Sequence, residues 1–180
     1  MKRIGIISDT HLSENGSRSL PAKVFSSLRG VDFLVHAGDF TSHRAMRELE
    51  TIAPLVGVRG NNDPEHLGLP STRRLTVEGV TLGVCHGDRP LNLHAPPLAD
   101  FPGNNATAAN AISQFEFEDD VRCIIFGHSH RPMAHWHTVE GRLVLLLNPG
   151  SPTDKRWSPN FGCAVLTIDG DVLTPDLVLW

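Results

Sequence analysis

The stretch RIGIISDTH, residues 3–11, decides the fold class. It is an apolar run that suits a buried strand, and it ends abruptly in Asp9-Thr10-His11. Other apolar runs along the chain end in the same way, in a short polar cluster. These pairs are Phe33–His36 with Gly38-Asp39, Leu55–Val58 with Gly60 to Asp63, Thr81–Cys85 with His86-Gly87, and Cys123–Phe126 with Gly127 to His130. Because open α/β sheets place their sites at the carboxyl ends of strands, the pattern predicts one site built from several strand ends.

Between the first three of these apolar runs, the apolar residues are spaced as on one face of a helix. One predicted helical face consists of Leu20, Val24, Phe25 and Leu28. Ser19 is the expected N-cap of this helix, just before Pro21, and Ser42 is the expected cap of a second helix over Arg44–Ile52. Strands that alternate with helices imply parallel pairing with right-handed crossovers.

Hairpins dominate the second half of the chain. Glu78-Gly79 connects predicted strands at Arg73–Val77 and Val80–Cys85. Further strands are predicted at Val121–Phe126, Met133–Thr138, Leu143–Leu147, Gly162–Ile168 and Val172–Leu177, with turns at Glu140-Gly141 and Asp169-Gly170. Arg89–Asn105 is a long connection, which indicates a functional or mobile loop, and Ala106–Phe117 suits a helix. The chain therefore predicts one domain over residues 1–180: an α/β fold of two packed, mixed sheets with helices outside.

Composition excludes several classes of protein. The chain has 180 residues and a net charge of −4 without a basic run, which argues against nucleic-acid binding and binding to anionic membranes. The first strand begins at residue 3, which leaves no room for a signal peptide, and no apolar stretch approaches the roughly 18 residues of a membrane span. We expect a cytoplasmic protein. Cys85, Cys123 and Cys163 lie in apolar runs and predict buried reduced thiols; a nucleophilic Cys85 beside His86 is the alternative.

The polar clusters offer metal ligands. In an extended segment the side chains of residues i and i+2 point the same way, so Asp9 and His11 would meet one metal ion, and His128 and His130 repeat this spacing. Asp39 has two oxygens that can bridge two cations. Asn61 supplies an amide oxygen and His86 a further imidazole. Divalent metals of hard to borderline character prefer this mixture, and two of them roughly 3.5–4 Å apart activate water and stabilise charge at phosphorus.

Each cluster has a simpler interpretation when it stands alone. Gly38-Asp39 is typical of a turn, Asn61-Asn62-Asp63 before Pro64 of a loop start, and His128-x-His130 of a polar pair. All of them in this order, each after an apolar run, favour a shared metal site. Asn148-Pro149-Gly150-Ser151 predicts a rigid turn behind the metal loops, in which Asn148 accepts a hydrogen bond from the outer nitrogen of a ligand histidine.

At these residues the sequence resembles the calcineurin-like metallophosphoesterase superfamily. The superfamily signature is D-x-H, G-D, G-N-x-(D/E), a strand-end His and G-H-x-H, and here it runs from Asp9 to His130. The small size and the segment from Asn148 to Ser151 are similar to the YfcE-like phosphodiesterase branch. The resemblance implies a four-layer α/β/β/α sandwich. One metal ion would take Asp9, His11, Asp39 and His130, and the other would take Asp39, Asn61, His86 and His128.

The chain departs from the superfamily pattern beside these ligands. Larger members have a leaving-group acid, a His, where this chain has Asn62. We expect Asn62 to hydrogen-bond a phosphate oxygen and Asp63 to orient it, as the catalytic residues. Ser42 replaces the second Asp of G-D-x-x-D, and Asp88 replaces a His on the substrate side.

The resemblance implies a phosphodiesterase, in which a hydroxide bound to two metal ions attacks phosphorus in line. The ligands suit Mn²⁺, with Fe, Ni or Zn as alternatives. The expected substrate is a small phosphate ester. A phosphomonoesterase is one alternative, although few Arg or Lys residues lie beside the motifs, which favours diesters. A protein-binding scaffold like the retromer subunit of this branch is another. The apolar stretch Leu177–Trp180 suits either a homodimer contact or a last core strand.

Overall fold

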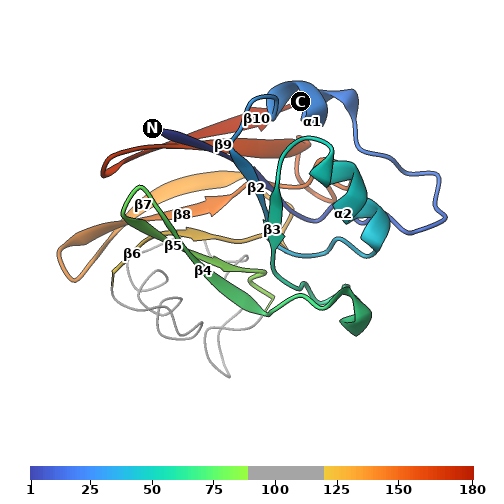
Figure 1. Cartoon of the computed structure of the whole chain (residues 1–180), viewed down its shortest axis with the longest axis horizontal. Helices are drawn as coiled ribbons and strands as arrows, with labels where there is room; N and C mark the ends of the chain where they lie inside the picture. Colours follow the sequence, from blue (N-terminus) through green and yellow to red (C-terminus); the bar gives the residue numbers. More distant parts are fainter. Residues whose placement is uncertain (89–119) are drawn as a thin grey trace.

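Two five-stranded sheets face each other in the computed structural model, which describes residues 1–88 and 120–180 (Figure 1). The first sheet has the order β10-β9-β1-β2-β3, with bounds Val172–Leu179, Gly162–Asp169, Lys2–Ile7, Phe33–His36 and Leu55–Gly57. The second sheet has the order β4-β5-β6-β8-β7, with bounds Thr72–Val77, Val80–Cys85, Val121–Ile125, Arg142–Asn148 and Met133–Val139. Both sheets are mixed, as predicted.

Parallel pairing brings the strand ends of the site together. β1 runs parallel to β2, with Ile4 opposite Phe33, and β2 runs parallel to β3. In the second sheet β5 and β6 are parallel, and β6 and β8 are parallel. The loops after β1, β2, β3, β5 and β6 therefore carry all the predicted metal ligands. The hairpins β4–β5, β7–β8 and β9–β10 are antiparallel, and β9 also pairs antiparallel with β1.

The main core lies between the two sheets, because alternate side chains of each strand point inward. Ile4 and Ile6 of β1 pack there against Ile125 and Leu147 of the second sheet, and all four are fully buried. Side chains on the other face of the second sheet are buried too, including Ile124, Val144 and Leu146. The predicted helix at Ala106–Phe117 and the loop Arg89–Asn105 lie outside the described residues.

Two helices cover the outer face of the first sheet. Figure 1 shows α1, Ala22–Ser27, on the side of this sheet away from the second sheet, and α2 is His43–Glu50. Val24 and Leu49 pack on Leu34 of β2 in a second core cluster. A short 3₁₀ helix, η1, spans Glu65–Leu67. The sandwich architecture implied by the resemblance is thus confirmed.

Some local predictions about the helices are wrong. α1 has Pro21 as its N-cap, not Ser19, and Phe25 is 37% exposed, so Val24 is the buried residue of this helix. Ser42 occupies the N-cap position of α2, but its hydroxyl donates to the carbonyl of Leu12 instead of capping the helix. The cap is lost because this hydroxyl holds the loop after β1 against α2.

The C-terminal stretch forms the last core strand. β10 pairs with β9 along its length, and Leu177 and Trp180 pack against the two core clusters. The homodimer contact and the single-domain organisation stay predictions. Within the two described ranges, no helix is long and apolar enough to cross a membrane.

Candidate metal centre

Left-handed backbone conformations shape the loops that carry the ligands. Asp9 and His11 have φ values of 53° and 44°, Asp39 has 62°, and His128 and His130 have 67° and 58°. The argument from an extended segment is therefore wrong: the chain leaves β1 at Ile7 and turns, so a turn rather than a strand brings Asp9 and His11 together. Each left-handed non-glycine residue costs on the order of 1–2 kcal/mol, although Asp and His tolerate it better than most. Strain of this kind concentrates at functional sites.

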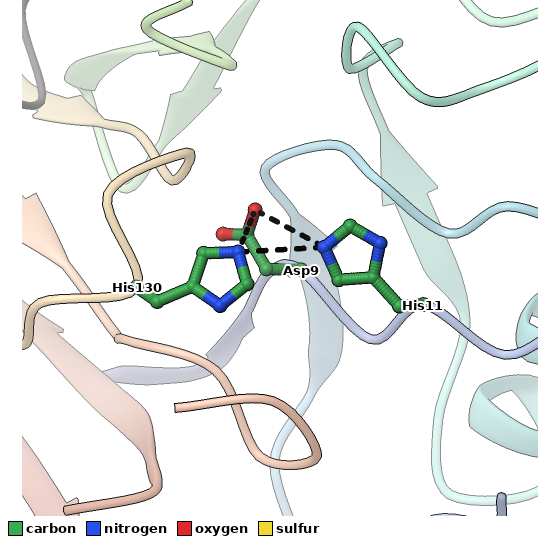
Figure 2. A group of neighbouring side chains, drawn as sticks. All are labelled: Asp9, His11 and His130. Atoms are coloured by element: carbon green, nitrogen blue, oxygen red, sulfur yellow. Dashed lines mark hydrogen bonds and ion pairs between the residues drawn. The ribbon is translucent and has the colours of Figure 1, made fainter. Parts of the chain in front are cut away.

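The first group of ligand atoms lies at the end of β1 (Figure 2). Asp9 Oδ1 is 3.3 Å from His130 Nε2 and 4.0 Å from His11 Nε2, and the two imidazole nitrogens are 3.4 Å apart. Asp9 Oδ1 is buried without a hydrogen-bond partner in the structure. A buried carboxylate oxygen is costly without a partner, and a divalent cation between these three atoms would supply one. The residues present therefore fit a metal ion.

A second group of ligand atoms surrounds Asp39 and Asn61. His86 Nε2 is 3.4 Å from Asp39 Oδ2 and 3.1 Å from Asn61 Oδ1, and His128 Nδ1 is 3.0 Å from the same Asn61 oxygen. Asp39 Oδ2 is also 3.6 Å from His11 Nε2 of the first group. The two groups therefore overlap at Asp39, the residue expected to bridge. Asp9, Asp39 and His86 form a further set of close ligand atoms.

Backbone carbonyls orient two of the histidines. The Nδ1 atom of His86 donates to the carbonyl of Ala37 at 2.7 Å, and that of His130 donates to the carbonyl of Asp154. These bonds place the proton on Nδ1 and leave Nε2 as the ligand atom. The prediction that Asn148 accepts such a bond is wrong, because its amide is committed elsewhere.

The segment 148–154 supports the metal loops, as its predicted rigid turn implies. Asn148 Nδ2 donates to the carbonyl of Gly127 at 2.8 Å, and its Oδ1 accepts from the amide of Gly150. Ser151 Oγ donates to the carbonyl of Asp9 at 2.7 Å, and Thr153 Oγ1 donates to that of Thr10 at 2.6 Å. This segment therefore fixes the loop of Asp9 and the loop of His128 relative to each other.

Close backbone approach explains the glycine beside Asp9. A Cβ atom on Gly127 would lie 2.6 Å from Asp9 Oδ2 and 2.8 Å from the Cβ of Ser8. The amide of His128 donates to that same Asp9 oxygen at 3.0 Å. Only glycine lets the loop after β6 pass this close to the carboxylate.

Asn62 and Asp63, the predicted catalytic pair, both contact the loop of Asp39. The amide N–H of Asn62 donates to Asp39 Oδ1 at 2.8 Å, and its Nδ2 donates to Asp39 Oδ2 at 2.7 Å. Asp63 accepts from the backbone amides of Asp39, Thr41 and Gly60 at 2.7–2.9 Å. In this geometry Asn62 orients the shared carboxylate, and Asp63 holds two ligand loops together. Burial raises the pKa of Asp63, and the charge of Asp39 adds to the effect.

The two ligand carboxylates are ionised. Burial would raise the pKa of Asp9, but the adjacent His130 imidazole and the charge of His86 lower it overall. Burial likewise opposes ionisation of Asp39, yet His86 and Asn62 hold its pKa well below the usual range. Burial alone would lower the pKa of His86, whereas its hydrogen bond with Asp39 and the charges of Asp9 and Asp39 raise it to about 9. Without metal the centre therefore keeps a proton that a cation would displace.

This proton makes the stability of the metal-free protein depend on pH. The ordinary pKa of the His86 side chain is 6.5 and its folded value is about 9, so its contribution is complete below pH 6.5 and is lost as the pH rises through 9. In a chelator, we expect the free energy of unfolding to fall by on the order of 3 kcal/mol between these pH values. Urea denaturation at both pH values measures it. His86→Gln should remove most of the decrease, and an unchanged decrease in this variant would contradict the assignment.

His36 is a neutral buried residue beside the centre. Its Nδ1 accepts from the amide of Gly38 at 3.2 Å, so Nε2 carries the proton and donates to Thr10 Oγ1 at 3.2 Å. Burial lowers its pKa to about 3. His36 is therefore a buried histidine whose two ring nitrogens are both hydrogen-bonded to the metal loops.

A polar cleft of about 240 Å³ opens next to Asn61. Its lining includes Arg59, Glu65 and Asp88. Arg59 is half exposed and lies 4.0 Å from Glu65, as a surface ion pair. Cys85, Cys123 and Cys163 are all buried, as predicted, and burial raises the pKa of Cys163 to about 12. Cys85 is fully buried, so a substrate in solution does not reach its thiol.

Several residues that build the site have no motif in the sequence. Ala37 and Asp154 contribute through carbonyls, which every residue type possesses. Arg156 reaches the carbonyl of His128 although the two lie 28 positions apart. The expectation that cationic side chains are scarce beside the motifs is therefore incomplete, because the fold brings Arg156 to them.

Comparisons with known proteins define the class. Residues 1–171 match the model of the calcineurin-like phosphoesterase superfamily domain. The chain belongs to this superfamily of metal-dependent hydrolases that act on phosphoester bonds. It is 35% identical over 177 residues to a probable metallophosphoesterase of Methanothermobacter thermautotrophicus, covering 97% of this chain and 91% of the relative.

Solved structures share the fold over nearly the whole chain. Vps29 of Entamoeba histolytica, complexed with Zn²⁺, has a TM-score of 0.71 and 20% identity, covering 98% of each chain. An archaeal phosphodiesterase has a TM-score of 0.65 and 19% identity, covering 98% of this chain and 99% of the other. At these identities the likeness shows the fold alone.

Proposed function

We propose that the protein is a phosphodiesterase that holds two divalent metal ions, with Mn²⁺ as the physiological metal. The observation that carries the proposal is the overlap of the two ligand groups at Asp39, whose Oδ2 lies within 3.6 Å of His11 Nε2 and 3.4 Å of His86 Nε2. Two ions there would supply a nucleophilic hydroxide for in-line attack and offset negative charge on the phosphoryl oxygens. Carboxylate, imidazole and amide ligands without thiolate suit Mn²⁺, with Fe, Ni or Zn as alternatives.

The residues around the centre have different roles in orienting the candidate ligands. The carbonyls of Ala37 and Asp154 accept hydrogen bonds from Nδ1 of His86 and His130, so Nε2 of each ring is the nitrogen that would bind a metal ion. Asn62 orients both oxygens of Asp39. An amide is no useful acid, so this position does not protonate a leaving group. The proposed substrates are therefore small esters with good leaving groups.

The polar cleft favours a diester over a monoester. Glu65 and Asp88 line it beside Asn61, with Arg59 as the cation. Carboxylates there disfavour the second negative charge of a monoester. The archaeal phosphodiesterase of the same fold is consistent with this choice. We place the enzyme in the cytoplasm, where reduced buried cysteines persist.

Hydrolysis of two model substrates tests the proposal. Protein stripped of metal is resupplied with Mn²⁺, Ni²⁺, Zn²⁺ or Mg²⁺, and kcat/KM is measured for bis-p-nitrophenyl phosphate and p-nitrophenyl phosphate. We expect Mn²⁺ to restore activity and the diester to be favoured by at least about tenfold, which is 1.4 kcal/mol in the barrier. A preference for the monoester would make the protein a phosphomonoesterase. Absence of both metal binding and hydrolysis would favour a protein-binding scaffold.

A further inference from the structure

Arg156 has an unusual backbone conformation for its residue type. Among the described residues, the non-glycine positions with positive φ fall into three sets. The metal loops contain Asp9, His11, Asp39, Thr41, His128 and His130, the hairpin turns contain Glu78 and Glu140, and Arg156 stands apart with φ of 47°. A long side chain gains nothing locally from this conformation, which is costly outside glycine. Such strain persists where the surrounding structure holds it in place, often at a functional site.

Neighbouring contacts hold Arg156 at the rim of the metal centre. Two residues before it, Asp154 accepts a hydrogen bond from the ring of His130, and Thr153 is anchored on Thr10. The guanidinium of Arg156 donates to the carbonyl of His128 through Nη1 at 3.4 Å. His128 belongs to the ligand group around Asn61. The guanidinium of Arg156 therefore lies beside the ligand group of His128 and Asn61, and the segment that carries it is hydrogen-bonded to His130 of the first group.

Most N–H donors of the Arg156 guanidinium have no hydrogen-bond partner among the described residues. It carries five N–H groups, and the long bond to His128 is the one that the structure shows to a described residue. The side chain is exposed, and no carboxylate of the described ranges lies within ion-pair distance of it. Arginine binds phosphate oxygens with two parallel N–H bonds, which a lysine cannot do. With respect to the described ranges, this capacity is available to a ligand from solution.

We propose that Arg156 is a substrate-binding residue that donates to a non-bridging oxygen of the phosphate held at the metal centre. The inference rests on the proposed function, since it needs a phosphoryl ligand there, but it does not require hydrolysis. It explains why the chain holds an arginine in a left-handed conformation at the end of a segment that otherwise supports the ligand loops. A single guanidinium matches the single charge of a diester phosphate.

Lys155 is a matched control. It is the adjacent cation, yet its Nζ donates to the carbonyl of Pro159 at 3.0 Å and lies 5.4 Å from the ring centre of Phe161. Its side chain is thus committed to Pro159 and Phe161. Lys155→Gln and Arg156→Gln make the same change in net charge one residue apart, so they separate a specific contact from the general field of the protein.

Phosphate binding tests the proposal without any catalytic step. Calorimetry measures the Kd of inorganic phosphate for the Mn²⁺-loaded wild-type protein, Arg156→Gln, Arg156→Lys and Lys155→Gln, and metal analysis gives the metal content of each. We expect Arg156→Gln to weaken phosphate binding by about tenfold or more, Arg156→Lys to restore part of it, and Lys155→Gln to change it by less than about twofold. In bis-p-nitrophenyl phosphate hydrolysis, Arg156→Gln should raise KM more than it lowers kcat.

Two results would overturn the role of Arg156, and a third would separate it from the proposed phosphodiesterase activity. Equal effects of Arg156→Gln and Lys155→Gln would overturn the proposal in favour of bulk electrostatics. Loss of metal from Arg156→Gln would also overturn it, because the bond to His128 would then be a structural clamp. Wild-type protein that binds phosphate through Arg156 but hydrolyses neither model ester would support the inference while the proposed phosphodiesterase fails.

Discussion

Asp39→Asn is expected to lower kcat/KM for bis-p-nitrophenyl phosphate by on the order of 10³-fold. Asp39 Oδ2 lies near ligands of both groups, at 3.6 Å from His11 Nε2 and 3.4 Å from His86 Nε2. An amide at this position has one oxygen and no charge. It can no longer neutralise two adjacent cations, so the protein should lose at least one of them. Metal analysis of the purified variant measures the loss directly.

Asp32→Asn is the matched control for Asp39→Asn. Asp32 is a surface carboxylate that pairs with Lys2 at 2.9 Å and accepts from the amide of Arg3 at 2.8 Å. The same chemical change there should leave kcat/KM within about twofold of the wild-type value, because exposed ion pairs contribute little. Wild-type activity in Asp39→Asn, with the metal content unchanged, would contradict the shared role of this carboxylate. Circular dichroism of the metal-free variants checks that both are folded.

Removal of metal is expected to abolish hydrolysis and to lower the melting temperature. The metal-free centre leaves Asp9 Oδ1 buried without a hydrogen-bond partner and keeps ionised Asp9 and Asp39 close together. A cation at 100 times its Kd stabilises the folded state by about 2.7 kcal/mol. For a chain of this size the melting temperature should then fall by roughly 5–10 °C in a chelator. Thermal denaturation with and without Mn²⁺ measures it.

The variant Asp39→Asn completes the metal-removal experiment. If the stabilisation arises at this centre, Mn²⁺ should raise the melting temperature of the wild-type protein and of Asp32→Asn by similar amounts, and that of Asp39→Asn by much less. An equal rise in all three proteins would place the stabilising cation elsewhere on the molecule. The rise should also grow between pH 6.5 and 9, because the cation competes with the proton on His86, whose pKa is about 9.

The sequence by itself determined the strands, the parallel pairing of the first three and the candidate ligands. Buried strands are apolar runs, and the polar residues that follow them can only lie at strand ends, so Asp9, Asp39 and His86 had to approach one edge of the sandwich. The hairpin turns at Glu78-Gly79 and Glu140-Gly141 followed from local backbone preference, and both glycines have positive φ. These features depend on residue type and short-range spacing, which a sequence displays directly.

The tertiary structure decided how the ligands converge and what surrounds them. Left-handed turns at Asp9 and His11, rather than an extended strand, bring the ligands together, and long-range contacts stabilise these turns. The carbonyls of Ala37 and Asp154 orient two histidines, yet a carbonyl leaves no trace in the sequence because every residue has one. Arg156 reaches the rim only because segment 148–154 docks on the loops of the first and second sheets. Contacts between residues far apart in the chain depend on the whole packed core, and local sequence patterns do not specify them.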